Sequence, residues 1–460
     1  MISNILVSEI VCRQKEYFAS GDTKNIEFRI QQLNKLKQLI TDSEDRVYQS
    51  LQLDLNKPQF ESFAAEITIL NKEIDDALKH LKCWSKPQKA RVPWQLLPAS
   101  ATICPEPLGV VLILGAWNYP LQLVIAPLIG AMAAGNCAII KPSELAPHTS
   151  GLVAEIIAKN FSPEYITVVE GGIETSQNLL SEKFDHIFFT GGTSVAKIVM
   201  TAAAKHLTPV TLETGGKNPC IIDTDIDINK TIKRLTWGKF LNAGQSCLAP
   251  DYLLVNHRIK DDLLAGFKQH LQTTYGDNPQ LSPDYARIIN YKHFDRLEKL
   301  LQADKIILGG EKNRDELYIA PTVMDNVNWE DKVMQEEIFG PILPIITYTD
   351  ISTAFAAINS LPKPLALYLF SRNQNIQKQV LESTSSGGVC LNDTMMHFSL
   401  PSLPFGGVGE SGMGRYHGKA SFDTFSHYKS IYKNPQWLDI NWRYPPYKGK
   451  LSFLKQLLRF

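Results

Sequence analysis

Short apolar runs alternate with helical stretches through the first half of the chain. Helical spacing or length marks Leu121–Ala134, Gly151–Lys159 and Val195–Lys205. Strands that alternate with helices are typical of βαβ units and a parallel sheet. This half therefore predicts a Rossmann-like, doubly wound domain that binds a nucleotide. The runs that we expect to be its strands are Val110–Leu114, Cys137–Ile140, Ile166–Val169, His186–Phe189 and Val210–Leu212.

A second series of apolar runs follows Glu213 and predicts a second α/β domain. Residues 25–85 are polar with helical spacing, whereas residues 91–106 carry several prolines and indicate an extended excursion. The runs of the second domain are Tyr252–Val255, Ile306–Leu308, Leu343–Thr347, Leu365–Phe370 and Val389–Leu391.

Composition narrows the class of protein. A chain of 460 residues is too long for one core, so two or three domains are expected. Lys plus Arg and Asp plus Glu both total 47, and a net charge of zero does not favour nucleic acid as the main partner. The seven cysteines form no CxxC pair and the ten histidines no HExxH, so we expect no metal site and a reducing compartment.

The stretch Pro107–Ile140 contains no charged residue and therefore tests whether the chain crosses a membrane. A membrane span needs about 20 continuous apolar residues. Here Asn118–Pro120, Gln122 and Gly135–Asn136 interrupt the stretch. A buried strand, a turn, a buried helix and a second strand explain it better. The N-terminus lacks a basic region and is a poor signal peptide.

One thiol and one carboxylate stand beside glycine turns. Cys247 ends the segment Asn242–Cys247 (NAGQSC), and Glu213 lies 34 residues earlier, in Val210–Lys217 (VTLETGGK). Together they offer a nucleophile and a base, as an enzyme that makes and hydrolyses a thioester requires. The alternative is a buried small hydrophobic cysteine and a surface charge. The flanking glycines favour the chemical interpretation.

Two strand ends offer contacts for a dinucleotide. The first, Phe189–Lys197, follows a strand and opens a helix, and free N–H groups at a helix start bind phosphate. A Gly-Gly pair alone is a weak signal. The second, Ile140–Glu144, offers hydrogen bonds to ribose hydroxyls, or else is a solvated turn with a Ser or Glu helix cap. The candidate residues are Gly191, Gly192, Thr193 and Ser194 in the first and Lys141, Ser143 and Glu144 in the second.

Two further segments have open alternatives. Asn118 follows the strand Val110–Leu114 and could donate to a developing oxyanion, or it could form an Asx turn before Pro120. Glu337 and Phe339 precede a turn and could hold ribose and nicotinamide, or they could mark a helix end.

Together these residues resemble the aldehyde dehydrogenase superfamily over nearly the whole chain. The most specific elements are Leu212–Lys217, Gly244–Cys247 and Glu337–Pro341, in this order and spacing. Two more, Leu403–Gly414 and His417–Phe422, resemble the class 3, fatty aldehyde branch.

The resemblance implies roles for the candidate residues. Cys247 would be the nucleophile and Glu213 the general base, while Asn118 and the Cys247 N–H would form the oxyanion hole. Two positions depart from the family pattern, because Thr214 replaces a leucine and Ala196 a glycine. The cofactor, NAD with NADP as the alternative, would contact Lys141, Ser143, Glu144, Gly191, Gly192, Thr193, Ser194, Glu337 and Phe339.

The resemblance also implies a small β bridging element that builds a homodimer. We expect a dinucleotide-binding domain at 1–90 and 107–211 and a catalytic domain at 212–390. The bridging element would comprise 91–106 and 391–435, and an amphipathic tail would follow at 436–460. Apolar residues of that tail share a helical face among basic side chains, which is typical of a membrane-surface helix. The alternative is that this face, with Leu451, Leu454, Leu457 and Leu458 beside Phe453 and Phe460, packs on the partner subunit or caps a substrate tunnel.

The expected activity is NAD(P)-dependent oxidation of medium- or long-chain apolar or aromatic aldehydes, such as fatty or polyene aldehydes, to acids. We expect the enzyme to be cytoplasmic, with peripheral contact with a membrane surface through the tail as an alternative. Three alternatives stay open, namely a coenzyme A-acylating dehydrogenase, a cofactor-free thiol acyltransferase or hydrolase, and an inactive scaffold. Glu213 argues against the first and the cofactor contacts against the second. An inactive scaffold would not need Cys247, Glu213 and Asn118 together.

Overall fold

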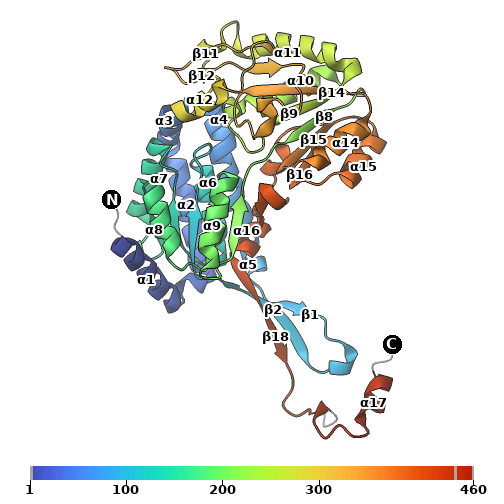
Figure 1. The fold of residues 1–460 in the computed structure, drawn as a ribbon. Helices are drawn as coiled ribbons and strands as arrows, with labels where there is room; N and C mark the ends of the chain where they lie inside the picture. The colour runs from blue at the N-terminus through green and yellow to red at the C-terminus, as the bar shows by residue number, and fades with distance from the viewer. Residues whose placement is uncertain (1–3, 440–442, 458–460) are drawn as a thin grey trace.

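A computed structural model describes residues 4–439 and 443–457 of the chain. Two α/β units lie one above the other, and a thin β arm extends from the lower one (Figure 1). This confirms the predicted α/β class, with a Rossmann-like unit, a second α/β unit and a small β element.

The first unit is built on a six-stranded sheet of order β17-β7-β6-β3-β4-β5. All pairings are parallel except that of β17 with β7. Every residue of β3, β4 and β6 is buried, which explains the uninterrupted apolar runs of the sequence. The strands are β3 (Val110–Leu114), β4 (Cys137–Lys141), β5 (Ile166–Val168), β6 (His186–Thr190), β7 (Val210–Glu213) and β17 (Gly412–Met413).

Helices pack against this sheet and against one another. The helix α6 (Gln122–Ala134) is buried along its whole length, so the uncharged stretch is a core helix. A π-helical turn, Phe63–Ile67, joins two of the N-terminal helices. The other helices of this unit are α1 (Asn4–Ser20), α2 (Ile26–Asp42), α3 (Glu44–Leu55), α4 (Gln59–Ser62), α5 (Thr68–Trp84), α7 (Pro147–Asn160), α8 (Ile173–Ser181), α9 (Thr193–Ala204) and α16 (Lys419–Thr424).

The second unit contains a seven-stranded sheet of order β10-β13-β14-β9-β8-β15-β16, parallel except for β10. The strands are β8 (Pro219–Ile222), β9 (Tyr252–Asn256), β10 (Ile306–Leu308), β13 (Thr322–Met324), β14 (Ile342–Tyr348), β15 (Ala366–Phe370) and β16 (Gly388–Leu391). The helices are α10 (Ile228–Phe240), α11 (Lys260–Tyr275), α12 (Tyr291–Glu298), α13 (Lys332–Gln335), α14 (Ile351–Ser360) and α15 (Gln374–Ser383), and a small hairpin joins β11 (Lys312–Asn313) to β12 (Tyr318–Ile319).

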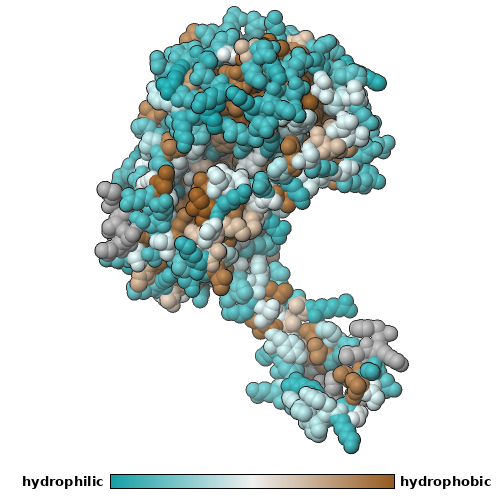
Figure 2. All heavy atoms as spheres, in the orientation of Figure 1, coloured by the Kyte–Doolittle hydropathy of each residue, from teal (hydrophilic) through white to brown (hydrophobic). Residues whose placement is uncertain are grey.

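The arm is a three-stranded antiparallel sheet of β1 (Gln88–Ala90), β2 (Ser100–Pro107) and β18 (Ser426–Lys433). Segments from both ends of the expected bridging element therefore meet in it, whereas residues 392–425 run back over the body of the molecule, where β17 and α16 lie. Figure 2 shows apolar side chains among polar ones on the arm.

In the described part of the tail, the short helix α17 (Lys450–Leu457) lies near the tip of the arm (Figure 1). Leu458 and Phe460 of the predicted apolar face lie outside the described residues. Within residues 4–439 and 443–457, no helix has both the length and the hydropathy that a membrane crossing requires.

Candidate active site

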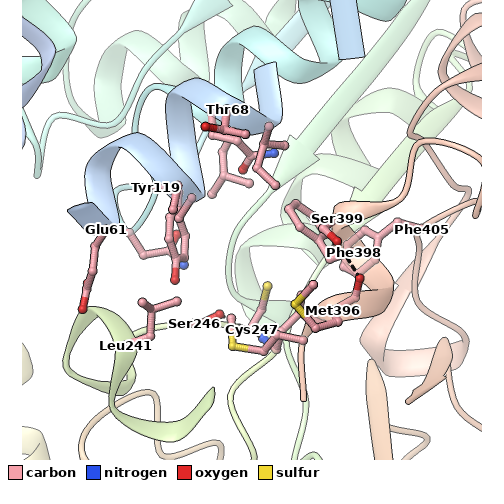
Figure 3. A pocket seen from close by; sticks show the side chains of 18 of the residues that line it. Glu61, Thr68, Tyr119, Leu241, Ser246, Cys247, Met396, Phe398, Ser399 and Phe405 are labelled. Atoms are coloured by element: carbon pink, nitrogen blue, oxygen red, sulfur yellow. Dashed lines mark hydrogen bonds between the residues drawn. The ribbon is translucent and has the colours of Figure 1, made fainter. Parts of the chain in front are cut away.

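A cavity of about 530 Å³ lies where the carboxyl ends of the first sheet meet the second unit (Figure 3). Cys247, Glu213 and Asn118 all line it, so the fold brings the three predicted catalytic residues together. Apolar and aromatic side chains form most of the remaining wall, including Phe60, Phe63, Leu123, Trp237, Leu241, Met395, Met396, Phe398, Phe405 and Tyr416.

Cys247 follows a turn of unusual backbone conformation. After α10, Asn242, Ala243 and Gly244 have φ values of 52°, 51° and 72°. Left-handed residues that are not glycine cost free energy and persist only where the surroundings enforce them. Gly244 is required here, because a Cβ would lie 2.3 Å from the Gly340 carbonyl oxygen. We call residues 241–246 the nucleophile turn.

Hydrogen bonds hold the nucleophile turn from several sides. Asn242 Nδ2 donates to the Asn118 carbonyl at 2.9 Å, and Gln245 Nε2 donates to the Arg287 carbonyl at 2.9 Å. The Ile289 N–H donates to Gln245 Oε1 at 3.0 Å. Asn242 and Gln245 of the segment Asn242–Cys247 therefore hold the backbone before Cys247 through the hydrogen bonds of their side-chain amides.

Asn118 is buried beside the same turn, with its Nδ2 donating to the Gln245 carbonyl at 3.1 Å. The backbone carbonyl of Asn118 accepts a hydrogen bond from Lys57 Nζ at 3.1 Å, and Lys57 forms a fully buried ion pair with Glu66 at 2.6 Å. One proton of the Asn118 amide is thus committed to the turn. No hydrogen bond of the other to a described residue is found, and Asn118 lines the cavity, which is compatible with a donor to an oxyanion.

Glu213 ends β7, and it is buried with neither carboxylate oxygen hydrogen-bonded to any described residue. Burial raises the pKa of Glu213 well above the usual range for a glutamate. A buried, unpartnered carboxyl of this kind is expensive for the fold. It is typical of a general base whose pKa is brought towards the working pH.

Burial also raises the pKa of the Cys247 thiol, and the carboxylates of Glu337 and Glu213 raise it further. The N–H groups of Cys247 and Leu248 oppose this shift. These surroundings favour the neutral thiol over the thiolate. A thiolate at this position would need a base to take the thiol proton.

The predicted cofactor residues lie at the same edge of the first sheet. Lys141 ends β4 and pairs with Glu144 at 2.5 Å, while Ser143 accepts a hydrogen bond from the Leu145 N–H at 3.3 Å. Gly192 is the N-cap of α9, with Thr193 and Ser194 in its first turn. A Cβ on Gly192 would meet nothing within 4 Å, so this helix start leaves room for a phosphate.

Glu337 and Phe339 face this edge from the second unit. A Cβ on Gly215 would lie 2.1 Å from Glu337 Oε2, which places Glu337 directly over the glycine turn after Glu213. Burial and Asp251 raise the pKa of Glu337 to about 8, although a hydrogen bond from the Gly216 backbone opposes the rise. Phe339 has φ 48° and contacts Trp117, with ring centroids 5.3 Å apart.

A dinucleotide fits this edge of the sheet. The start of α9 is open above Gly192, and Glu337 Oε1 is buried without a partner among the described residues. Among those residues, no cluster of ligating side chains suits a metal ion.

Sequence reasoning missed the groups that support the site rather than react in it. These include Lys57 with Glu66, and Glu61, whose carboxylate accepts a hydrogen bond from the Asn242 N–H at 2.9 Å. A second buried pair joins Glu73 to His417 Nδ1 at 2.5 Å, and His417 lies next to Tyr416 of the cavity wall. His417 stands in the segment His417–Phe422 that marked the family resemblance, but its partner Glu73 lies 344 positions away. Glu61 and Lys57 stand in no segment singled out from the sequence, and they bond Asn242 and Asn118, 181 and 61 positions away.

Comparison with known proteins identifies the relatives of this chain. The model of the aldehyde dehydrogenase family matches residues 5–431. The 4,4'-diaponeurosporen-aldehyde dehydrogenase of Staphylococcus aureus is 49% identical, over 97% of both chains. Aldehyde dehydrogenase family 3 member A2 of Rattus norvegicus is 47% identical, over 97% of this chain and 93% of the relative. The solved substrate-bound state of Staphylococcus aureus AldH superposes with a TM-score of 0.96, at 48% identity, over 98% of this chain and 99% of that one.

Proposed function

Because the chain belongs to the aldehyde dehydrogenase family, whose members use NAD or NADP, we propose that it oxidises medium- or long-chain apolar or aromatic aldehydes to carboxylic acids. The observation that carries the substrate class is the cavity beside Cys247, whose wall is mostly aliphatic and aromatic. Its volume of about 530 Å³ lies within the range typical of small-molecule sites. The names of the Staphylococcus and rat relatives point to polyene and class 3 enzymes.

In this proposal the thiolate of Cys247 attacks the aldehyde carbonyl, and the electrons of the carbonyl π bond form the oxyanion of a thiohemiacetal. Its oxyanion accepts hydrogen bonds from the free proton of the Asn118 amide and from the Cys247 N–H. When bound at the edge marked by Gly192 and Glu337, NAD or NADP supplies the acceptor for the hydride that the thiohemiacetal loses. A thioester on Cys247 results.

Glu213 then takes a proton from water, which attacks the thioester and releases the acid. Neither carboxylate oxygen of Glu213 has a hydrogen-bond partner among the described residues, and this supports a group that binds and orients water. A coenzyme A-acylating enzyme would not need this base, so the buried Glu213 favours hydrolysis over transfer.

The test uses purified protein, a series of straight-chain aldehydes and the absorbance of the reduced nicotinamide. We expect kcat/KM to rise with chain length, since each buried CH₂ contributes about 0.8 kcal/mol, and to level off once the cavity is filled. Cys247→Ala should abolish turnover without changing the fold by circular dichroism. A flat series would contradict the apolar substrate class, and turnover in Cys247→Ala would contradict the nucleophile.

We further infer that the enzyme is a homodimer built through the arm, and that it is cytoplasmic. Trp94, Leu97 and Tyr432 are more than half exposed on the arm, which supports burial against a second copy. For the tail, three roles stay open, namely contact with a membrane surface, packing on the partner subunit and closure of the cavity mouth.

A further inference from the structure

Glu61 is a carboxylate of the cavity wall that contacts the nucleophile turn directly. It is the third residue of α4, and its Oε2 accepts a hydrogen bond from the Asn242 N–H at 2.9 Å. In Figure 3 the Glu61 side chain descends from the helix towards the turn that carries Leu241, Ser246 and Cys247.

This bond is made where the chain leaves α10. The Leu241 N–H still bonds back to the Trp237 carbonyl, whereas the next N–H, that of Asn242, donates to Glu61. Asn242 is also the first of the three residues with positive φ. A strained conformation is stable only when its surroundings over-determine it, and Glu61 supplies one such restraint at the start of the strained segment.

The surroundings of Glu61 make its ionisation sensitive to pH near neutrality. Burial raises the pKa of Glu61 to about 7, while the Asn242 N–H and Lys57 lower it and Asp284 raises it. Burial raises the pKa values of three neighbouring phenols, Tyr119, Tyr275 and Tyr285, and the Glu61 charge raises them further. A charged acceptor makes a stronger hydrogen bond than a neutral one.

We propose that Glu61 is a positioning residue for the nucleophile, because its carboxylate holds the strained turn that orients Cys247. The proposal rests on the assignment of Cys247 as the nucleophile in the proposed function. Loss of the Glu61 carboxylate would let the turn relax, and the Cys247 sulfur and N–H would leave the geometry needed for attack and for the oxyanion hole. As pH falls through about 7, Glu61 becomes protonated and the hold on the turn weakens.

The experiment compares Glu61→Ala with Glu61→Gln, whose amide oxygen accepts the same hydrogen bond without titrating. Two rates are measured between pH 6 and 9, the alkylation of Cys247 by iodoacetamide and kcat/KM for a short aldehyde. Glu61→Ala should slow both at least about tenfold at pH 8, as expected for loss of a hydrogen bond to a charged group. Glu61→Gln should restore part of the rate, because its neutral oxygen accepts a weaker bond, and the part of the wild-type decline that occurs near pH 7 should be absent from its profile.

A matched control separates positioning from general loss of stability. Asp350→Ala removes a bond of the same kind, which the Ser352 N–H donates to Asp350 Oδ1 at 3.0 Å at the start of α14 in the second unit. It should lower Tm about as much as Glu61→Ala, with no effect on either rate. Wild-type rates in Glu61→Ala, or Glu61→Gln as slow as Glu61→Ala, would overturn the proposal. Turnover in Cys247→Ala would instead overturn the proposed function.

Discussion

At the scale of single residues, the polar groups around the cavity are held by partners that lie far away in the sequence. Cys247, Glu213 and Asn118 stand in short motifs whose chemistry is local, and the structure brings all three to one cavity. Glu61 bonds a residue 181 positions away, and Lys57 bonds one 61 positions away. Neither carries a local signal, because a buried glutamate and a surface glutamate look alike until the chain is folded.

The buried carboxyl of Glu213 makes the stability of the folded protein depend on pH. A folded-state pKa above the unfolded one means that the native protein binds more protons, so the free energy of unfolding falls as pH rises from about 4.5 towards the raised pKa. Glu337, with a pKa raised to about 8, acts in the same direction. Glu213 and Glu337 therefore lower the free energy of unfolding most in the pH range in which they are ionised.

We expect Glu213→Gln to be more stable and less active than the wild type. At pH 8 the free energy of unfolding of Glu213→Gln should exceed that of the wild type by about 1–3 kcal/mol, because the amide avoids a buried charge. Glu213 is needed for hydrolysis more than for acylation, so one burst of reduced cofactor per site should precede a slow steady state. Thermal unfolding at pH 5 and pH 8 and stopped-flow absorbance measure the two effects. A stability gain of equal size at both pH values would assign it to packing instead of ionisation, and absence of the burst would place Glu213 in an earlier step.

At the scale of elements, the apolar runs located strands in both sheets, whether buried throughout, as β3 is, or partly exposed, as β10 is. Val110–Leu114 and Ile306–Leu308 match observed strands from end to end. The strands β8 and β13 were not predicted, because each is three or four residues long and β8 begins with a proline, which leaves little periodic signal. The helices α10 to α15 were also missed, and so the helix that presents the nucleophile turn was not found.

The two glycines that follow β6, Gly191 and Gly192, have different structural roles. Gly191 is required by packing, because a Cβ would lie 2.5 Å from the Phe189 ring. Gly192 has ordinary φ and ψ angles of −71° and 148° and open space on its side-chain side. The fold therefore tolerates alanine at Gly192, and only a ligand at the start of α9 would require glycine there.

For this reason Gly192→Ala should leave Tm within about 1 °C of the wild type, consistent with a small effect on folding. We expect it to raise the Kd for NAD several-fold, because the methyl group occupies the space that a pyrophosphate would fill. Titration of cofactor by fluorescence measures Kd without turnover. An unchanged Kd for both NAD and NADP would place the pyrophosphate elsewhere, and a large fall in Tm would show that the space above Gly192 is needed by the protein itself.

At the scale of the whole molecule, the sequence indicated an extended excursion at 91–106 but could not give its pairing. β2 pairs with β18 across more than 300 positions, in a register that runs from Ser426 opposite Pro107 to Lys433 opposite Ser100. Such pairing depends on the complete fold. Most of β18 is exposed, and a projecting sheet with exposed aromatic side chains is the kind of surface that an oligomer covers.

The tail near the tip of this arm has three candidate roles, namely membrane contact, subunit packing and closure of the cavity. α17 is short, and Leu451 is 62% exposed on it while Lys455 lies in its last turn. A basic amphipathic helix can bind an anionic membrane surface, where long apolar aldehydes also collect. We expect deletion of residues 447–460 to reduce co-sedimentation with anionic phospholipid vesicles. It should also lower kcat/KM for long-chain aldehydes presented in those vesicles, while short aldehydes react normally.

Three measurements on the same truncated protein separate these roles. Sedimentation velocity reports the oligomeric state, vesicle binding reports the membrane contact, and the chain-length series in detergent reports access to the cavity. Unchanged vesicle binding with a selective loss on long aldehydes in detergent would mean that the tail closes the cavity mouth. Equal losses on short and long aldehydes, together with a smaller sedimentation coefficient, would mean that it packs on the partner subunit. Only a loss confined to vesicle-borne substrate supports the membrane role, because removal of a surface-binding helix changes where the enzyme meets its substrate and leaves the chemistry at Cys247 intact.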